Sequence, residues 1–272
     1  MNFLRLLLTS CMLFLLAGCF QVTTVVRVNP DGSGTVEENM LLSKKLVAQI
    51  EGIMGSFGGN GEKPKPFELF EPAKLKERAS SMGQGVSYLS GKKVETSDYT
   101  GYTATYAFIN INTLKLSQQN GDPTGNSEPK DLPFTFSFSK GSPATLTIVQ
   151  PQTKASEKTP SAPEQEPSFH ADTKPQMSDE NAKKFMELFM GIKLVLAVEM
   201  NGTIVSTNAT HVDGNRLTIV DLDLAKLGNA GPELEKLSLL ENSSFEEARE
   251  LLKGIPGIRF DMNEKLTVVF KK

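Results

Sequence analysis

Gly101-Tyr102-Thr103-Ala104-Thr105-Tyr106-Ala107-Phe108 is the stretch of this sequence that decides its fold. A strand places alternate side chains on opposite faces. One face therefore carries Tyr102, Ala104, Tyr106, Phe108 and Asn110, and the other carries Thr103, Thr105, Ala107 and Ile109. Such an aromatic face is most often the core side of a sheet packed under helices. The alternative is a ligand platform, with Tyr106 and Phe108 as candidate ligand-binding residues.

Other segments around this strand predict hairpins. Turn residues separate pairs of strands rich in β-branched and aromatic residues. The expected pairs are 22–28 with 35–42, 86–94 with 102–111, 134–138 with 144–149, and 258–262 with 266–270. Further strands are expected at 193–200, 204–208 and 216–222. This pattern predicts an antiparallel sheet of hairpins.

Several segments have helical periodicity. Ser43 precedes a helix with Leu46 and Ile50 on one face, and Pro72 begins a helix in which Leu75, Ala79 and Met82 share a face. Short helices are also expected at 234–240 and, after a capping box at Ser244 and Glu247, at 245–252. We therefore predict an α+β fold with several packed helices.

The helix expected from Ser178 has an apolar stripe that includes Phe185, Met186 and Phe189. A stripe of this kind usually packs on an adjacent sheet. The alternative is that it binds a lipid or a partner helix, which makes these three residues candidate ligand-binding residues.

A proline-rich segment interrupts the chain. Residues 151–177 contain five prolines and no valine, isoleucine or leucine. Such a segment cannot bury enough apolar area to offset its ordering entropy, so disorder is expected. We predict a signal peptide at 1–18, the first part of the α+β domain at 19–150, a disordered linker or insertion at 151–177, and the second part at 178–272. The alternative is that 178–272 forms a second small domain.

The N-terminus has the layout of a secretory signal. A charged start containing Arg5 precedes an apolar run that is too short to span a bilayer permanently. Leu16-Ala17-Gly18-Cys19 resembles the bacterial lipobox. The resemblance implies cleavage between Gly18 and Cys19, a diacylglyceryl thioether on Cys19 and acylation of its new amino group. An ordinary signal peptide with a chance cysteine is the alternative.

An anchor of this kind would hold the protein on a membrane surface, since two or more acyl chains give stable attachment. In the sorting of Gram-negative lipoproteins, which this pattern resembles, Asp after the cysteine retains a protein at the inner membrane. The residue after Cys19 is Phe20. This favours the outer membrane, on its periplasmic or surface side, if the source is Gram-negative.

The charge, cysteine and histidine content of the chain argues against several classes of function. Removal of Arg5 with the signal leaves 28 of the 29 basic residues against 32 acidic ones, which argues against nucleic-acid binding. The two cysteines, Cys11 and Cys19, both lie in the signal region, so no disulfide or cysteine metal site is expected. His170 and His211 have no second histidine at metal-ligand spacing. We expect no metal or other cofactor.

Acidic pairs could in principle support catalysis. Asp221 and Asp223 alternate along a strand and share a face, but a solvated sheet face explains them better than a pair of catalytic carboxylates. Ser137 and Lys140 match Ser-x-x-Lys on a strand and its turn, whereas the enzymes with this motif place it on a helix. We expect a protein that is not an enzyme.

Three motifs taken together resemble the LppM-like bacterial lipoproteins. They are the hairpin Val25 to Val36 after the lipobox, the stretch 101–114, and the stretches 201–208 and 214–219. The resemblance implies an α+β domain on a lipid anchor, in a group of largely unknown function, with both sides of the linker in one domain.

These observations lead to one main functional expectation and two alternatives. The first is a lipid-anchored envelope protein that binds a lipid, glycolipid or other apolar ligand between its sheet and helices. The second is a structural or assembly partner of an envelope protein complex. The third is an envelope hydrolase, because fold alone does not exclude chemistry.

Overall fold

The computed structural model describes residues 19–57, 68–116, 133–150, 191–227 and 245–272. The signal peptide with Gly18, the proline-rich segment and the helix expected at 178–190 lie outside these residues, as does the helix expected at 234–240.

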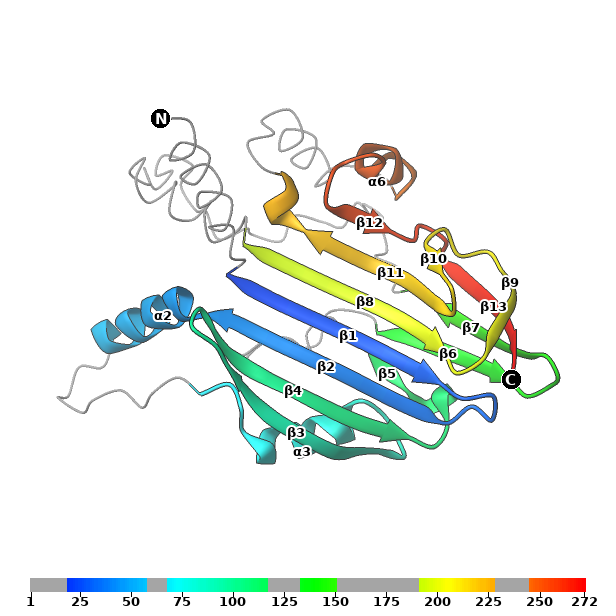
Figure 1. The fold of residues 1–272 in the computed structure, drawn as a ribbon, viewed down its shortest axis with the longest axis horizontal. Coiled ribbons are helices and arrows are strands. Elements are labelled where there is room, and N and C mark those ends of the chain that lie inside the picture. The colour runs from blue at the N-terminus through cyan, green and yellow to red at the C-terminus, as the bar shows by residue number, and fades with distance from the viewer. Residues whose placement is uncertain (1–18, 58–67, 117–132, 151–190, 228–244) are drawn as a thin grey trace, which may run out of the picture.

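An eight-stranded main sheet is built from the described residues and crosses the molecule from end to end (Figure 1). Its strand order is β10-β11-β8-β1-β2-β4-β3, and β12 pairs with β11 beside this path. The strands are β1 (Phe20–Val28), β2 (Gly34–Ser43), β3 (Val86–Glu95), β4 (Tyr99–Phe108), β8 (Ile192–Met200), β10 (Val212–Asp213), β11 (Arg216–Asp223) and β12 (Ile258–Phe260). The hairpins β1–β2 and β3–β4 were predicted correctly.

The main sheet is mixed, which corrects the prediction of a purely antiparallel sheet. β1 and β8 run parallel, with Phe20 opposite Ile192 and Val28 opposite Met200. Parallel neighbours need a long crossover connection, and here the connection contains β2 to β7 and the proline-rich segment. Strands from both sides of that segment therefore lie in the same sheet.

A second sheet has five strands among the described residues, in the order β5-β6-β7-β13-β9. They are β5 (Lys115–Leu116), β6 (Phe134–Ser139), β7 (Ala144–Val149), β9 (Thr203–Thr207) and β13 (Lys265–Lys271). The hairpin β6–β7 was predicted correctly. The predicted terminal hairpin was wrong: β12 pairs with β11 in the main sheet, whereas β13 pairs with β7 and β9.

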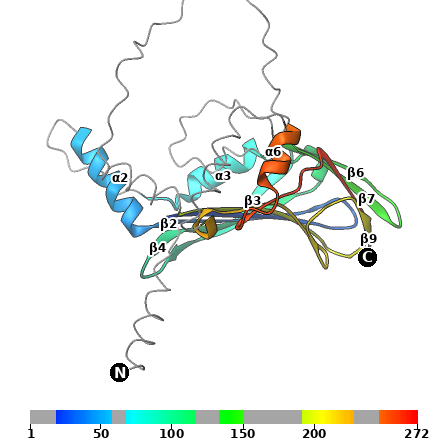
Figure 2. The same ribbon diagram turned by 90° about the horizontal axis from the view of Figure 1, so that it is seen from above.

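Helices make up a small part of the described structure, which is mostly β. They are α2 (Lys44–Phe57), α3 (Pro72–Ser81) and α6 (Phe245–Leu252), with 3₁₀ turns η1 (Ile111–Thr113) and η3 (Leu224–Leu227). Figure 2 shows α2, α3 and α6 on the same side of the main sheet. The Ser43 hydroxyl accepts a hydrogen bond from the Leu46 amide at 3.2 Å, as its predicted capping role requires.

The aromatic face of β4 is the core face of the main sheet. Tyr102, Tyr106 and Phe108 are all buried under α3 and the second sheet. The strand ends earlier than predicted, at Phe108, because the Asn110 side chain accepts a hydrogen bond from the Asn112 amide and begins η1. Ile109 is consequently 77% exposed.

Candidate ligand pocket

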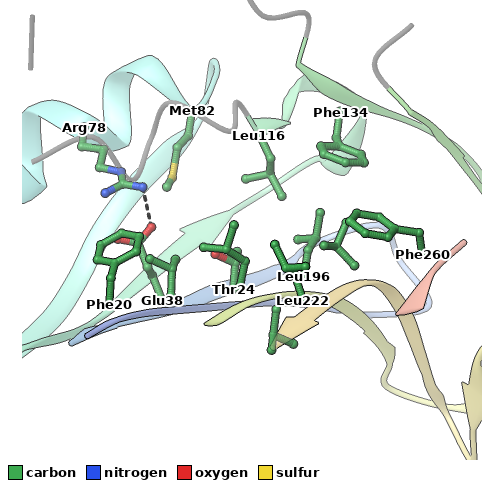
Figure 3. A pocket seen from close by; sticks show the side chains of 14 residues that line it. Phe20, Thr24, Glu38, Arg78, Met82, Leu116, Phe134, Leu196, Leu222 and Phe260 are labelled. Atoms are coloured by element: carbon green, nitrogen blue, oxygen red, sulfur yellow. Dashed lines mark hydrogen bonds and ion pairs between the residues drawn. The ribbon is translucent and has the colours of Figure 1, made fainter. Parts of the chain in front are cut away.

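A pocket of about 490 Å³ lies over the core face of the main sheet (Figure 3). This volume falls within the range of about 300–1,000 Å³ that is typical of small-molecule sites. In Figure 3, Arg78, Met82, Leu116 and Phe134 face the sheet residues across the pocket.

The sheet side of the pocket is apolar because three adjacent strands present aligned side chains. Val22 lies opposite Leu194 in the β1–β8 register, and Leu194 lies opposite Leu222 in the β8–β11 register. The next aligned positions on these strands supply further lining residues. The strands β1, β8 and β11 contribute Phe20, Val22, Leu194, Val195, Leu196, Val220 and Leu222 to the apolar wall, and other elements contribute Met82, Leu116, Phe134 and Phe260. The unpredicted parallel pairing of β1 with β8 therefore builds the floor of the pocket.

Three polar residues, Thr24, Glu38 and Arg78, line the same pocket. Glu38 is 1% exposed, and its two carboxylate oxygens have different partners. Arg78 Nη2 donates to Glu38 Oε2 at 2.5 Å, and the Tyr102 hydroxyl donates to Glu38 Oε1 at 2.5 Å. Arg78 Nη1 also donates to the Tyr102 hydroxyl at 3.1 Å. The three side chains thus form a closed cluster in which the buried carboxylate has both hydrogen bonds and an opposite charge.

Burial sets the protonation behaviour of this cluster. It raises the pKa of Glu38, while the Arg78 charge and the Tyr102 hydrogen bond oppose the rise. Burial, followed by the negative charge of Glu38, also raises the pKa of Tyr102. Tyr102 is therefore a hydrogen-bond donor throughout the physiological range.

The arrangement places a polar cluster beside an apolar wall. Arg78 Nε is buried and has no hydrogen-bond partner among the described residues, while Arg78 and Glu38 together give the pocket wall a polar part. Thr24, opposite Glu38 in the β1–β2 register, adds a hydroxyl nearby. A molecule with one polar group and an apolar chain matches these features.

The structure places two of the predicted ligand-binding residues outside this lining. Tyr106 is fully buried and packs edge-to-face on Tyr88 at a centroid distance of 6.0 Å, and Phe108 is 2% exposed. Neither borders the pocket, and direct ligand contact by them stays a prediction. Phe185, Met186 and Phe189 lie outside the described residues.

Cys19 immediately precedes the first residue of the pocket wall, Phe20. Its carbonyl accepts a hydrogen bond from the Ser43 amide at 2.8 Å, and the Phe20 amide donates to the Gly191 carbonyl at 3.1 Å. The predicted lipidation residue is thus fixed between β2 and the start of β8.

The acidic pair and His211 lie apart from this cluster. Asp221 pairs with Arg259, and Asp223 lies 3.4 Å from Lys226 Nζ. His211 borders a smaller hollow of about 190 Å³ that Arg259 also lines. Within the described ranges, no three His, Cys, Asp or Glu side chains are grouped as a metal site would require.

Glu38 and Arg78 were not among the predicted site residues, although the sequence contains a signal for their cluster. Glu38 falls in phase with Val36 and Met40, which face the core from β2. Arg78 lies three residues after Leu75, on the buried face of α3. A charged residue on each of two apolar faces predicts a buried ion pair, although the sequence does not say that the two faces meet.

The fold and the pocket together define a strand-rich α+β domain with an apolar cavity that has a polar cluster in its wall. No family model matches the sequence, and no curated protein matches it. Among solved structures, the chain is similar to the folded domain of the Mycobacterium tuberculosis protein LppM, determined by NMR, with a TM-score of 0.29 and 11% sequence identity. The match covers 74% of this chain and 82% of that domain.

None of the helices in the described ranges is long and apolar enough to cross a membrane.

Proposed function

We propose that this chain is an LppM-like, lipid-anchored envelope lipoprotein whose domain binds a lipid, glycolipid or other amphipathic molecule in the pocket above β1, β8 and β11. The observation that carries the proposal is the pocket of about 490 Å³, in which an apolar wall surrounds Thr24, Glu38 and Arg78. The binding is non-enzymatic.

The division of the pocket into apolar and polar parts supports this ligand class. An acyl chain against Leu194, Leu196 and Leu222 would gain about 0.8 kcal/mol for each methylene removed from water. A polar group of the ligand would lie beside Thr24, Glu38 and Arg78, which line the same pocket.

A tryptophan reporter tests the ligand directly, because the chain contains no tryptophan. Leu222→Trp places the indole in the pocket wall, and Val205→Trp is the matched control on an exposed residue of β9. Titration of the detergent-solubilised full chain with dansyl-undecanoic acid should give energy transfer from residue 222 and little from residue 205. Equal transfer from both positions, or none from either, would contradict the proposal.

Native mass spectrometry of gently purified protein gives an independent measurement. Unmodified protein should carry a co-purifying lipid, and Leu196→Arg should lose it because a buried guanidinium without a partner is costly. Val205→Arg serves as the surface control. Repeated absence of bound lipid from the unmodified protein would count against a lipid ligand.

The proposed anchor has its own test. Cys19→Ser should abolish incorporation of labelled palmitate and leave soluble or uncleaved protein, since no thiol remains for lipidation. Membrane fractionation distinguishes these results from the processed, outer-membrane form expected for the unmodified chain. A processed Cys19→Ser protein in the outer membrane would disprove the lipobox assignment.

A further inference from the structure

The proposed lipid attachment point and the pocket are adjacent in the chain and in space. Cys19 carries the acyl groups in the proposed function, and Phe20 already lines the pocket. The backbone hydrogen bonds to Ser43 and Gly191 tie these residues into the sheet. The anchor therefore leaves the domain without an intervening linker, and the orientation of the domain on a bilayer is restricted.

The pocket lies toward the same end of the main sheet as Cys19. Its lining residues Val22 and Leu194 are the third residues of β1 and β8, and Leu222 is the next-to-last residue of the antiparallel β11. The opposite end of β1 is its turn with β2, where a Cβ built on Gly32 would lie 2.7 Å from the Phe138 ring of the second sheet. Figure 1 shows that β9, β13 and the C-terminus also lie toward that opposite end.

The end of the main sheet at which β1 begins, called the anchor end below, carries both lysines and acidic residues. The ends of the strands, with α2 and η3 after them, carry Lys44, Lys45, Lys93, Lys193 and Lys226 together with Glu51, Glu95, Asp98 and Asp223. Glu95 forms ion pairs with both Lys44 and Lys93. Asp223 forms ion pairs with both Lys193 and Lys226. Lys44 and Lys45, at the start of α2 beside the anchor, favour contact with anionic headgroups.

From these observations we propose that the anchor end of the main sheet docks on the bilayer, and that the pocket takes up an acyl chain of a phospholipid from that bilayer. This inference rests on the proposed anchor and pocket. It adds the source of the ligand, the bilayer itself, and the face of the domain through which the ligand enters. The lysines of the anchor end contact the anionic headgroups, and the apolar pocket floor formed by β1, β8 and β11 binds the acyl chain.

Quenching by brominated lipid tests the docking. Full-length lipidated Leu222→Trp and Val205→Trp proteins are reconstituted into vesicles of phosphatidylethanolamine and phosphatidylglycerol with brominated acyl chains, which quench tryptophan on contact. We expect loss of most of the emission from residue 222 and unchanged emission from residue 205. Equal emission from residue 222 in brominated and plain vesicles would overturn the proposal.

Charge reversal supplies a second measurement. In the Leu222→Trp background, Lys44→Glu with Lys45→Glu should reduce the quenching, while Lys271→Glu with Lys272→Glu at the opposite end should not. The first pair lies at the N-terminus of α2, where acidic residues stabilise a helix, and the Lys44–Glu95 ion pair that the change removes is exposed and contributes little, so folding should be retained. Equal effects of the two pairs would overturn the proposed docking face.

The detergent titration and the vesicle experiment distinguish failure of the ligand-binding proposal from failure of the docking proposal. If the tryptophan at position 222 transfers energy to dansyl-undecanoic acid in detergent and yet is not quenched by brominated bilayer lipid, the pocket binds apolar ligands and the docking proposal is wrong. If neither probe reaches residue 222, the proposed ligand-binding function fails as well.

Discussion

Glu38 of β2 and Arg78 of α3 form an ion pair of 2.5 Å, between Oε2 and Nη2, across forty positions of sequence. The carboxylate side chain is 2% exposed and the guanidinium side chain 16% exposed. This pair joins α3 to the main sheet and at the same time forms part of the pocket wall. Stability and ligand recognition therefore depend on the same two residues.

Removal of Arg78 alone should be strongly destabilising. Arg78→Met leaves the Glu38 carboxylate buried with Tyr102 as its remaining neutral partner, and breaking a buried pair in this way costs about 3 kcal/mol. Denaturant unfolding at neutral pH measures the loss. The exposed pair of Lys74 with Glu71 provides the control, since Lys74→Met should change stability by less than about 1 kcal/mol.

Simultaneous replacement of both partners should recover much of this loss. Arg78→Met with Glu38→Leu removes both charges and leaves an apolar contact, which is often neutral relative to a buried ion pair. A double-mutant cycle would then give a large coupling energy between positions 38 and 78. Simple addition of the two single effects would show that the pair does not act as a unit.

Stability should fall with rising pH because of Glu38. Its pKa in the folded protein is raised above the ordinary value of 4.5, so the folded state binds this proton more tightly than the unfolded state. The resulting contribution to stability is fully present below pH 4.5 and is lost as the pH rises through the higher folded-state pKa. Glu38→Gln cannot titrate, so its free energy of unfolding should lack this fall when the two proteins are compared from pH 4 to pH 8. A parallel pH dependence in both proteins would contradict the assignment to Glu38.

Local patterns predicted most of the individual elements. Alternation identified β4 and its buried face, and helical spacing placed Leu75 and Ala79 on the buried face of α3, with Met82 buried at its C-cap. These patterns depend on residues close together in sequence. Even the polar cluster left a local trace, because Glu38 interrupts an apolar face of β2.

The pairing of distant strands could not be predicted in the same way. β1 and β8 are both apolar strands, but nothing local distinguishes a parallel partner more than 150 positions away from an antiparallel neighbour. The last two strands likewise have the appearance of a hairpin, yet each pairs with a strand formed earlier in the chain. The lining residues of the pocket were missed for this reason, since they come from strands that meet only after these pairings form.

An ion-pair network on the opposite face of the main sheet tests the parallel pairing. Glu199 of β8 accepts hydrogen bonds from Arg27 of β1 at 3.0 Å and from Arg216 of β11 at 2.6 Å. Glu199→Gln should cost about 1 kcal/mol, because it removes the charge between two arginines in a partly buried network. The difference in free energy of unfolding between Glu199→Gln and the unmodified protein should be smaller in high salt. Glu250→Gln, which affects an exposed pair with Lys253, should have little effect on unfolding in either condition.

The close contact of β2 with β4 makes Gly101 a sensitive position. A Cβ built on Gly101 would lie 1.9 Å from the Met40 carbonyl oxygen, which belongs to the backbone of the neighbouring strand. Gly101→Ala must therefore separate the two strands, and a cost of about 1–3 kcal/mol is expected from overpacking. Gly52→Ala in α2 is the matched control, because a Cβ there meets nothing within 4 Å and alanine favours a helix by about 0.5–1 kcal/mol. Thermal unfolding should consequently shift down for Gly101→Ala and slightly up for Gly52→Ala. An unchanged melting temperature for Gly101→Ala would show that β2 and β4 are less closely paired than the structure requires.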